Sequence, residues 1–417
     1  MRRFRPLAPR AGGLLLLSLL WNCPALQASE QPAIPEERKP LCLQESLRLP
    51  NWLKLELSYS AEPMANPLGG LAQSSAWIQE GSINLSASSG HQRPKQRWTE
   101  ADHWRVNLNL NHVSGDSSYA TRIGAFLNPQ TLSYPTSFYP TELSLERKAG
   151  TGWLQVKAGV IPLESDFDGA LMTAPIFNSY VHSALNDTYN ILLNGLPINP
   201  YSTLGAVVDL NARPDLTLRY GWYDLNSTTW MSTRLGASSA STPSGLGSAH
   251  VLQLDYSPAG LSGKAPAGSS LPPGLLSVGG FRTSSNGGEG LYGSASWRSG
   301  LNLGIDHRIW LGGSYSPSVS LDPAPSFVGG GLVVQGLFPK RPFDVLVLGG
   351  GHAGLSSQAS PSFPTKPYEG LIELGYRLQV NPNLNLQPTL QWIFNPSGTN
   401  TPTPGILTTG VQISLNL

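Results

Sequence analysis

The chain has 417 residues, of which 13% are charged and 40% hydrophobic, and its formal charge is +1. This balance gives no basic excess that would attract a polyanion, so no nucleic-acid partner is expected. Two cysteines are too few for a cysteine-based metal cluster, and no His pair has ligand spacing, so no metal site is expected.

The first 28 residues show the order of a secretory leader. Four arginines precede the apolar run "GGLLLLSLLW", and the small-residue stretch "ALQA" ends at Ala28. This order predicts a signal peptide over 1–28, because about ten apolar residues are too few to cross a bilayer as a helix. Removing it leaves 23 Lys and Arg against 26 Asp and Glu, and Cys42 as the single cysteine.

From residue 77 onward, apolar and polar residues alternate, as in "WRVNLNLN", "LIELGYRLQV" and "VQISLNL". A period of two is typical of β-strands with one apolar and one polar face. In chain order we expect strands at 77–88, 104–113, 119–127, 140–147, 153–161, 201–210, 216–224, 250–256, 275–283, 289–297, 301–311, 331–338, 343–348, 371–380, 384–394 and 408–417.

The gaps between these segments are alternately short, such as "KAGTG" and "NPN", and long and rich in Gly, Pro, Ser and Thr, such as "GASSASTPSGLGS". Short turns on one side and long loops on the other are typical of outer-membrane barrels. We therefore expect an all-β fold, a transmembrane antiparallel β-barrel of about 16 strands over 77–417, with a water-filled lumen. Residues 29–76 are expected to form a periplasmic extension, and whether they plug the barrel or add a strand stays open. One long connection, from Ser257, falls on the side of the short turns.

The stretch "FDVLVLGGGHAGLSS" places Gly349, Gly351 and Gly354 at the spacing of a dinucleotide-binding loop. Such a loop needs a following helix whose N-terminal amides receive the pyrophosphate. The prolines in "LSSQASPSFPTKP" prevent a regular helix there. We therefore expect no cofactor, and we expect the glycines to begin an outward loop.

The C-terminal sequence "YEGLIELGYRLQVNPNLNLQPTLQWIFNPSGTNTPTPGILTTGVQISLNL" resembles the end of the carbohydrate-selective porins of the OprB type. The segment "GLVVQGLFPKRPFDVLVLG" is also similar to one of that family, and weaker likeness covers most of the mature chain. The chain departs from the usual aromatic terminus of barrel proteins by ending in Leu417.

The resemblance implies passive diffusion of sugars and other small hydrophilic solutes, and no enzymatic activity. It also implies insertion by the barrel assembly machinery into outer-membrane lipid of a Gram-negative-type bacterium, a group that includes cyanobacteria, and leaves a homotrimer open. Two alternatives remain: a non-selective or ion-conducting porin, and a structural barrel without a transport role.

Two sets of residues are candidates for contact with the solute. In porins generally the third outer loop folds into the lumen, and here that loop, 162–200, carries polar and aromatic groups that suit the hydroxyls and ring faces of sugars. These are Asp166, Asp168, Asn178, Tyr180, Asn186, Asp187 and Tyr189. The second set comprises charges expected on the lumen side of the wall, where opposed charges select by polarity: Asp306, Arg308, Arg341, Asp344, Glu373 and Arg377. An ordinary surface loop and cross-strand ion pairs that only stabilise the sheet are the alternative interpretations.

Overall fold

The computed structural model describes residues 43–89, 103–150, 152–167, 179–186, 196–226, 247–263, 271, 274–284, 287–299, 304–359 and 366–417. All of them belong to one unit, Arg38–Leu417. The predicted signal peptide lies outside the described residues.

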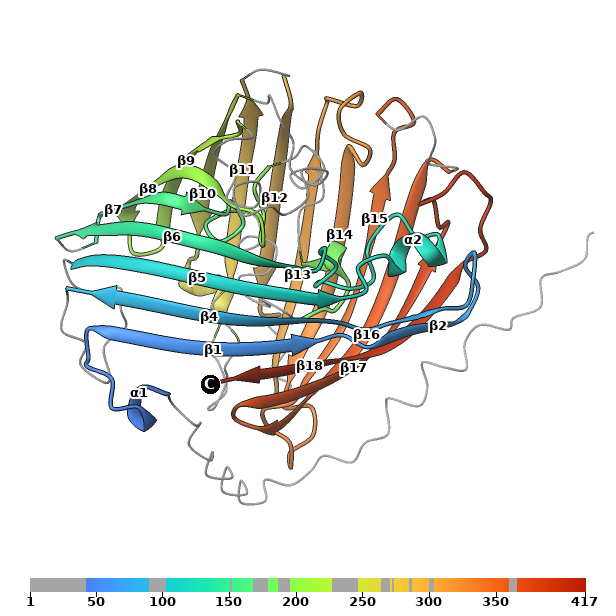
Figure 1. Ribbon diagram of the computed structural model, residues 1–417, viewed down its shortest axis with the longest axis horizontal. Helices are drawn as coiled ribbons and strands as arrows, with labels where there is room; N and C mark the ends of the chain where they lie inside the picture. Colours follow the sequence, from blue (N-terminus) through green and yellow to red (C-terminus); the bar gives the residue numbers. More distant parts are fainter. Residues whose placement is uncertain are drawn as a thin grey trace, which may run out of the picture. The chain divides into compact units, whose positions relative to one another are not determined.

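The elements of the described chain are mostly strands (Figure 1). They are α1 Leu43–Ser46, β1 Leu53–Ala61, β2 Met64–Leu68, β3 Ser75–Ala76, β4 Ile78–Ser88, β5 His103–Gly115, α2 Tyr119–Ile123, β6 Ser137–Ala149, β7 Leu154–Ile161, η1 Ser183–Leu185, β8 Thr203–Arg213, β9 Leu216–Asp224, β10 Ser248–Tyr256, α6 Ala259–Ser262, β11 Leu275–Thr283, β12 Glu289–Trp297, β13 Asp306–Tyr315, β14 Ser326–Gln335, β15 Val345–Gly354, β16 Tyr368–Asn381, β17 Leu384–Phe394 and β18 Ile406–Asn416. No helix among the described residues is long and apolar enough to cross a membrane.

The strands form one antiparallel sheet that closes on itself. From β4 to β18 each strand pairs with the next along the chain, and β1 pairs with both β18 and β4 (Figure 1). Because β2 continues β1 beyond Pro63 and β3 continues into β4, the strand segments make a barrel of 16 strands, as predicted.

The sequence-based assignment contains two errors that cancel in this count. Residues 53–61 and 64–68, expected within a periplasmic extension, are a strand of the wall, so the predicted barrel start at residue 77 is wrong. The strand predicted at 119–127 is absent, because this stretch forms α2 and a loop inside the lumen. The described part of the long connection from Ser257 contains α6, and β10 pairs directly with β11 in the wall.

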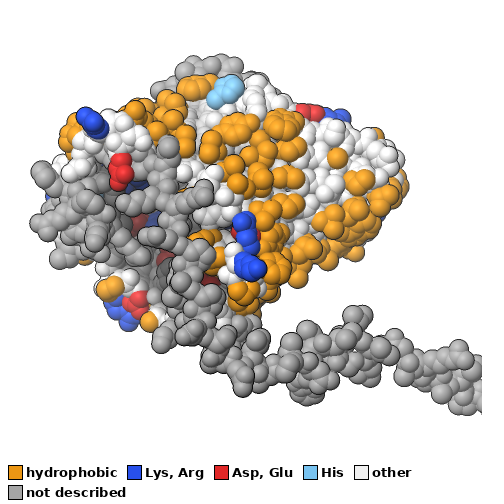
Figure 2. All heavy atoms as spheres, turned by 90° about the horizontal axis from the view of Figure 1, so that it is seen from below, with side chains coloured by type: hydrophobic (Ala, Val, Ile, Leu, Met, Phe, Trp, Pro, Cys, Tyr) orange, Lys and Arg blue, Asp and Glu red, His pale blue; other side chains and the backbone are white. Residues whose placement is uncertain are grey.

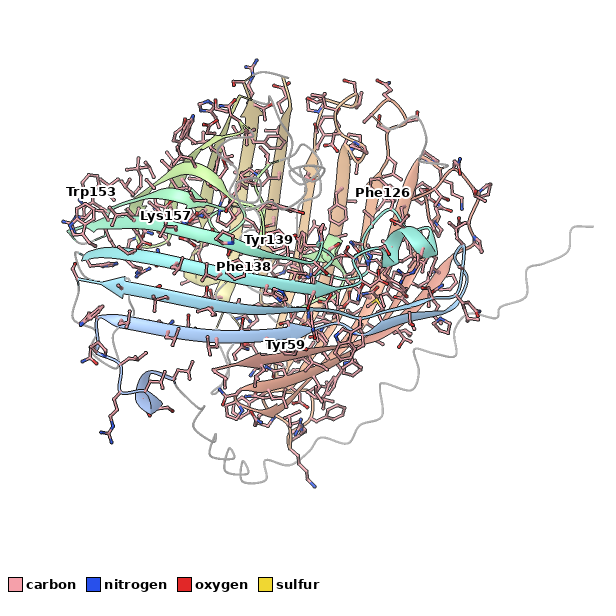
Figure 3. The ribbon with its side chains drawn as sticks, viewed as in Figure 1. Tyr59, Phe126, Phe138, Tyr139, Trp153 and Lys157 are labelled. Atoms are coloured by element: carbon pink, nitrogen blue, oxygen red, sulfur yellow. The ribbon has the colours of Figure 1, made fainter. Side chains whose placement is uncertain are left out.

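The period of two separates a lipid-facing side from a lumen side. On β6, Phe138 is half exposed on the outer surface and the adjacent Tyr139 is buried in the lumen (Figure 3). Exposed Leu, Val, Ile and Trp side chains occur on most strands, and Figure 2 shows hydrophobic side chains gathered on the face that it presents. Trp153, at the turn before β7, is also exposed (Figure 3), a position typical of the aromatic belt at a membrane interface.

The glycines of the dinucleotide-like motif lie within β15 and not in an outward loop, so this prediction was wrong. Gly349 and Gly351 face the lumen, across from Gly331 and Gly329 of β14. A Cβ atom at Gly349 would lie 2.6 Å from the ring of Tyr180, and one at Gly331 would lie 2.3 Å from its hydroxyl oxygen. The glycines therefore make room for a side chain that approaches the wall from inside the barrel.

The pairing of β1 with β18 can be tested with a disulfide. Tyr59 and Leu415 are directly opposed, and partners in an antiparallel ladder have Cα atoms about 4.5–5.5 Å apart, within disulfide range. We expect Tyr59→Cys with Leu415→Cys, in a Cys42→Ser background, to form an intramolecular disulfide upon oxidation, seen as a mobility shift on non-reducing gels. Tyr59→Cys with Leu390→Cys, which are not opposed, is the control. Absence of the disulfide in the folded protein would contradict the closure described here.

Candidate functional site

Two loops fold from the strand ends into the lumen. The loop 116–136, between β5 and β6, carries α2, and the loop 162–202, between β7 and β8, carries η1. The described residues 179–186 of the second loop lie against β13 to β17, on the inner face of the wall. The backbone amides and carbonyls of such loops have no partners in a β-ladder, so side chains and backbone groups of the wall must supply their hydrogen-bond partners.

Tyr180 fixes one point of the loop 162–202 against the wall. Its hydroxyl accepts a hydrogen bond from Trp310 Nε1 at 2.9 Å and donates to the carbonyl oxygen of Leu348 at 3.1 Å. The two rings meet edge to face with centroids 5.7 Å apart. Tyr180 is fully buried, so its ring faces the wall and not the open lumen.

Glu373 of β16 holds the same loop through its backbone. Its two carboxylate oxygens accept the N–H groups of Val181 and His182, each at 2.8 Å. Gln387 Nε2 donates to the carbonyl of Ser179 at 2.7 Å. Burial lowers the pKa of His182 to about 3, so this imidazole is neutral at physiological pH and adds no charge to the lumen.

The loop 116–136 is held in the same way by two further glutamates. Glu369 accepts the N–H of Phe126 at 2.9 Å and that of Leu127 at 2.7 Å. Glu62, between β1 and β2, accepts the N–H of Leu132 at 3.2 Å and Gln412 Nε2 at 2.8 Å. The two loops also contact each other, because Ser183 N–H donates to the carbonyl of Asn128 at 3.1 Å. Of the three anchoring glutamates, Glu373 was among the predicted site residues, and Glu62 and Glu369 were not.

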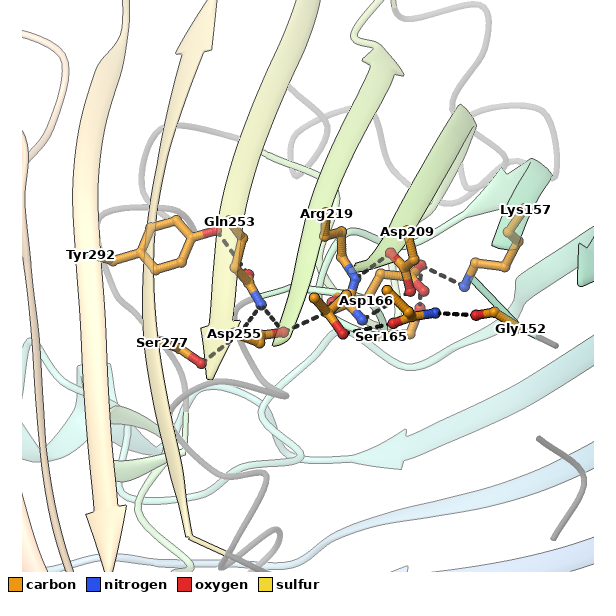
Figure 4. Close-up of polar contacts among 12 residues, drawn as sticks. Gly152, Lys157, Ser165, Asp166, Asp209, Arg219, Gln253, Asp255, Ser277 and Tyr292 are labelled. Carbon is orange, nitrogen blue, oxygen red and sulfur yellow. Dashed lines mark hydrogen bonds and ion pairs between the residues drawn. The ribbon is translucent and has the colours of Figure 1, made fainter. Parts of the chain in front are cut away.

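An ion-pair network holds the beginning of the loop 162–202 (Figure 4). Lys157 Nζ lies 2.5 Å from Asp166 Oδ2, and Arg219 donates to the main-chain oxygen of Asp166. Arg219 also pairs with Asp209 at 2.7 Å and Asp255 at 3.3 Å. The loop is thus attached to β7 and β9 at Asp166 and to β16 at Val181.

Two cavities lie between these loops and the wall. The larger, about 520 Å³, lies against β4 to β6, and the smaller, about 290 Å³, lies against β1, β16, β17 and β18. Both are lined by Glu80, Glu164 and Asn199, so they adjoin at these residues. The remaining lining is rich in hydroxyl and amide groups: Ser58, Ser60, Ser82, Asn109, Asn111, Thr131, Thr141, Asn186, Asn385, Gln412, Ser414 and Asn416.

Apart from the loop anchor Glu373, the predicted wall charges occupy three different settings. Arg377 lines the smaller cavity and donates to Gln387 Oε1 at 2.9 Å. Asp306 and Arg308 lie on the lumen side of β13, where Arg308 and Arg298 both pair with Asp306. The third setting is the turn between β14 and β15, where Arg341 pairs with Asp344 at 2.8 Å.

The predicted loop residues are distributed differently. Asp166 is used in the ion-pair network, and Asn186 lines the smaller cavity while its Nδ2 donates to the carbonyl of Tyr180 at 2.7 Å. The other four lie outside the described residues: Asp168, Asn178, Asp187 and Tyr189. Within the described part of the chain, no group of three or more His, Cys, Asp or Glu side chains is placed to hold a metal ion.

The model of the carbohydrate-selective porin family OprB matches residues 97–417. The chain belongs to this family. The resemblance inferred from the C-terminal sequence is thereby confirmed, and so is the prediction that the chain is a porin and not an enzyme. This OprB-family chain is an outer-membrane β-barrel porin of the carbohydrate-selective class.

Solved structures agree with this fold. The high-pH structure of OprB from Pseudomonas putida is 18% identical, with a TM-score of 0.72 over 90% of this chain and 96% of that chain. The low-pH structure of the same protein is 14% identical, with a TM-score of 0.55 over 90% and 95%. At these identities the likeness concerns the fold of the OprB-family barrel. No curated protein matches this sequence.

We expect Glu373→Ala to release the described part of the loop 162–202 without unfolding the barrel. Two amide donors lose a charged acceptor, and each such hydrogen bond contributes about 1.5–3 kcal/mol. Amide hydrogen exchange over residues 179–186 should therefore become at least about tenfold faster. Glu289→Ala, at an exposed carboxylate of β12, is the control. Unchanged exchange in Glu373→Ala would show that Glu373 is not the anchor.

Proposed function

We propose that sugars diffuse through the passage formed by the two adjoining cavities, and that the inward loops set its width. The observation that carries this proposal is the shared lining at Glu80 of β4 and at Glu164 and Asn199 of the loop 162–202, which border both cavities. The hydroxyl and amide side chains around it match the hydrogen-bonding groups of uncharged sugars.

The residues predicted to line the pore have different roles in this proposal. Asn186 and Arg377 line the smaller cavity and are the predicted residues that we place at the passage. Asp166 and Glu373 act through the loop that they anchor. We also propose that four further residues of the loop contact the solute, as predicted: Asp168, Asn178, Asp187 and Tyr189.

Membership of the porin family suggests how this barrel is assembled and where it is located. We infer that the barrel is inserted by the assembly machinery of a Gram-negative-type bacterium and that its apolar outer side chains contact outer-membrane lipid. A homotrimer is the proposed assembly, and its alternative is a monomer. A non-selective or ion-conducting porin, or a structural barrel, is the alternative function.

Replacing Asn178 to Tyr189 by a short Gly-Ser linker should widen the passage. The replacement removes the contacts of Tyr180, Val181 and His182 with the wall, so the resistance for ions and the barrier for bulky sugars should fall together. Planar-bilayer conductance and liposome swelling with sugars of increasing size measure the two effects. If neither the conductance nor the size cutoff changes, the loop does not set the width of the passage.

Arg377→Ala should shift ion preference toward cations. The substitution removes the one guanidinium among the described residues that line the two cavities and leaves Glu80 and Glu164 in place. We expect the cation-to-anion permeability ratio to rise by about twofold or more, measured as reversal potential in a salt gradient. Flux of neutral sugars should change less. Arg282→Ala, which alters an exposed arginine on the outer face of β11, should leave the ratio unchanged.

A further inference from the structure

The smaller cavity has an apolar patch in an otherwise polar lining. Leu132 and Tyr134, both from the loop 116–136, are the one aliphatic and the one aromatic side chain in its described lining. The wall strands β1, β17 and β18 contribute polar groups to the same cavity, among them Ser58, Asn385 and Ser414. A solute in this cavity therefore meets hydroxyl and amide groups of the wall and a hydrocarbon surface of the loop.

The two residues of the apolar patch border the cavity on one side and are supported on the other. Both are only partly buried, and both pack against the hydrophobic cluster that contains Tyr139 and Tyr201. The ring of Tyr134 meets that of Tyr201 edge to face, with centroids 6.0 Å apart. Tyr201 meets Tyr139 in the same way at 5.7 Å. Three tyrosines in contact thus fix the ring that lines the cavity.

The backbone of the loop also fixes the position of the patch. Leu132 N–H donates to Glu62 Oε2 at 3.2 Å, and Tyr134 N–H donates to the carbonyl of Leu132 at 2.7 Å. On the other side of Tyr134, the carbonyl of Pro135 accepts the hydroxyl of Tyr139 at 2.7 Å. Because Tyr134 is held between two contacts with the wall, its ring loses little conformational freedom when a solute packs on it.

A flat apolar surface beside polar groups matches the chemistry of a cyclic sugar. In a pyranose with equatorial hydroxyls, the hydroxyls point outward around the ring and the C–H groups form an apolar face. An acyclic polyol offers the same hydroxyls but no rigid face, so it gains less from an aromatic surface. Resting on the proposed sugar passage, we propose that Tyr134, together with Leu132, is a platform for the apolar face of pyranose sugars and makes the passage favour them over acyclic polyols.

Block of the ion current by added sugar, measured in planar bilayers with the full-length porin, tests this platform. The probes are glucose, which is a pyranose, and sorbitol, which is its acyclic reduced form. The wild type should be half-blocked at a lower concentration of glucose than of sorbitol. In Tyr134→Ala the half-blocking concentration of glucose should rise by about threefold or more, because the aromatic contact with the sugar ring is lost, and that of sorbitol should change less. Tyr134→Phe keeps the ring and should keep the preference.

Tyr315→Ala is the matched control, because Tyr315 is exposed on the outer face of β13 and is absent from the described lining of both cavities. If Tyr134→Ala does not assemble, Tyr134→Leu takes its place, since leucine keeps the packing on the tyrosines and lacks the flat ring. Block that does not distinguish the two probes in the wild type, or an equal rise for both probes in the Tyr134 variant, would overturn the platform while liposome swelling in glucose still supports the sugar passage. Failure of glucose to enter the liposomes would overturn the passage and the platform together.

Discussion

Backbone N–H and C=O groups within the hydrocarbon of a membrane have no water to bind, and this constraint determines the fold of the whole chain. A sheet meets it only by closing on itself. Here closure depends on β1, which pairs with β18 on one side and β4 on the other. Once the sheet is closed, alternate side chains must face lipid and lumen, and the polar residues of each strand are gathered in the interior.

The interior then has to receive loops that carry their own unpaired backbone groups. Three glutamates, Glu62, Glu369 and Glu373, supply acceptors for the amides of the two loops. A carboxylate suits this task because its two oxygens accept several hydrogen bonds and donate none. The same kind of acceptor therefore holds two loops that come from different parts of the chain.

Much of the barrel could be predicted from the sequence, because period-two alternation directly reflects the two faces of a wall strand. The alternating pattern gives a wrong assignment where the apolar residues pack inside the lumen and do not face lipid. Ile123, Ala125 and Leu127 alternate like a strand, yet they pack inside the lumen against the wall. Residues 53–61 alternate as well, but their place in the wall depends on pairing with β18, which lies at the other end of the chain.

The site was predicted less completely for a physical reason. A glutamate on the wet face of a strand has the same sequence pattern whether it faces water or anchors a loop, and Glu62 and Glu369 are recognised only by the amides that reach them. Gly331 and Gly349 are similar, because the approach of Tyr180 and not the local sequence explains them. The contacts that hold the lumen loops and the wall together join residues distant along the chain: Phe126 and Glu369 are 243 positions apart, and Glu62 and Gln412 are 350 apart. Because the loop 116–136 is bonded to Glu369 of β16 and the loop 162–202 to Glu373 of β16 and Gln387 of β17, neither loop can make all of its described contacts until these C-terminal strands are in place.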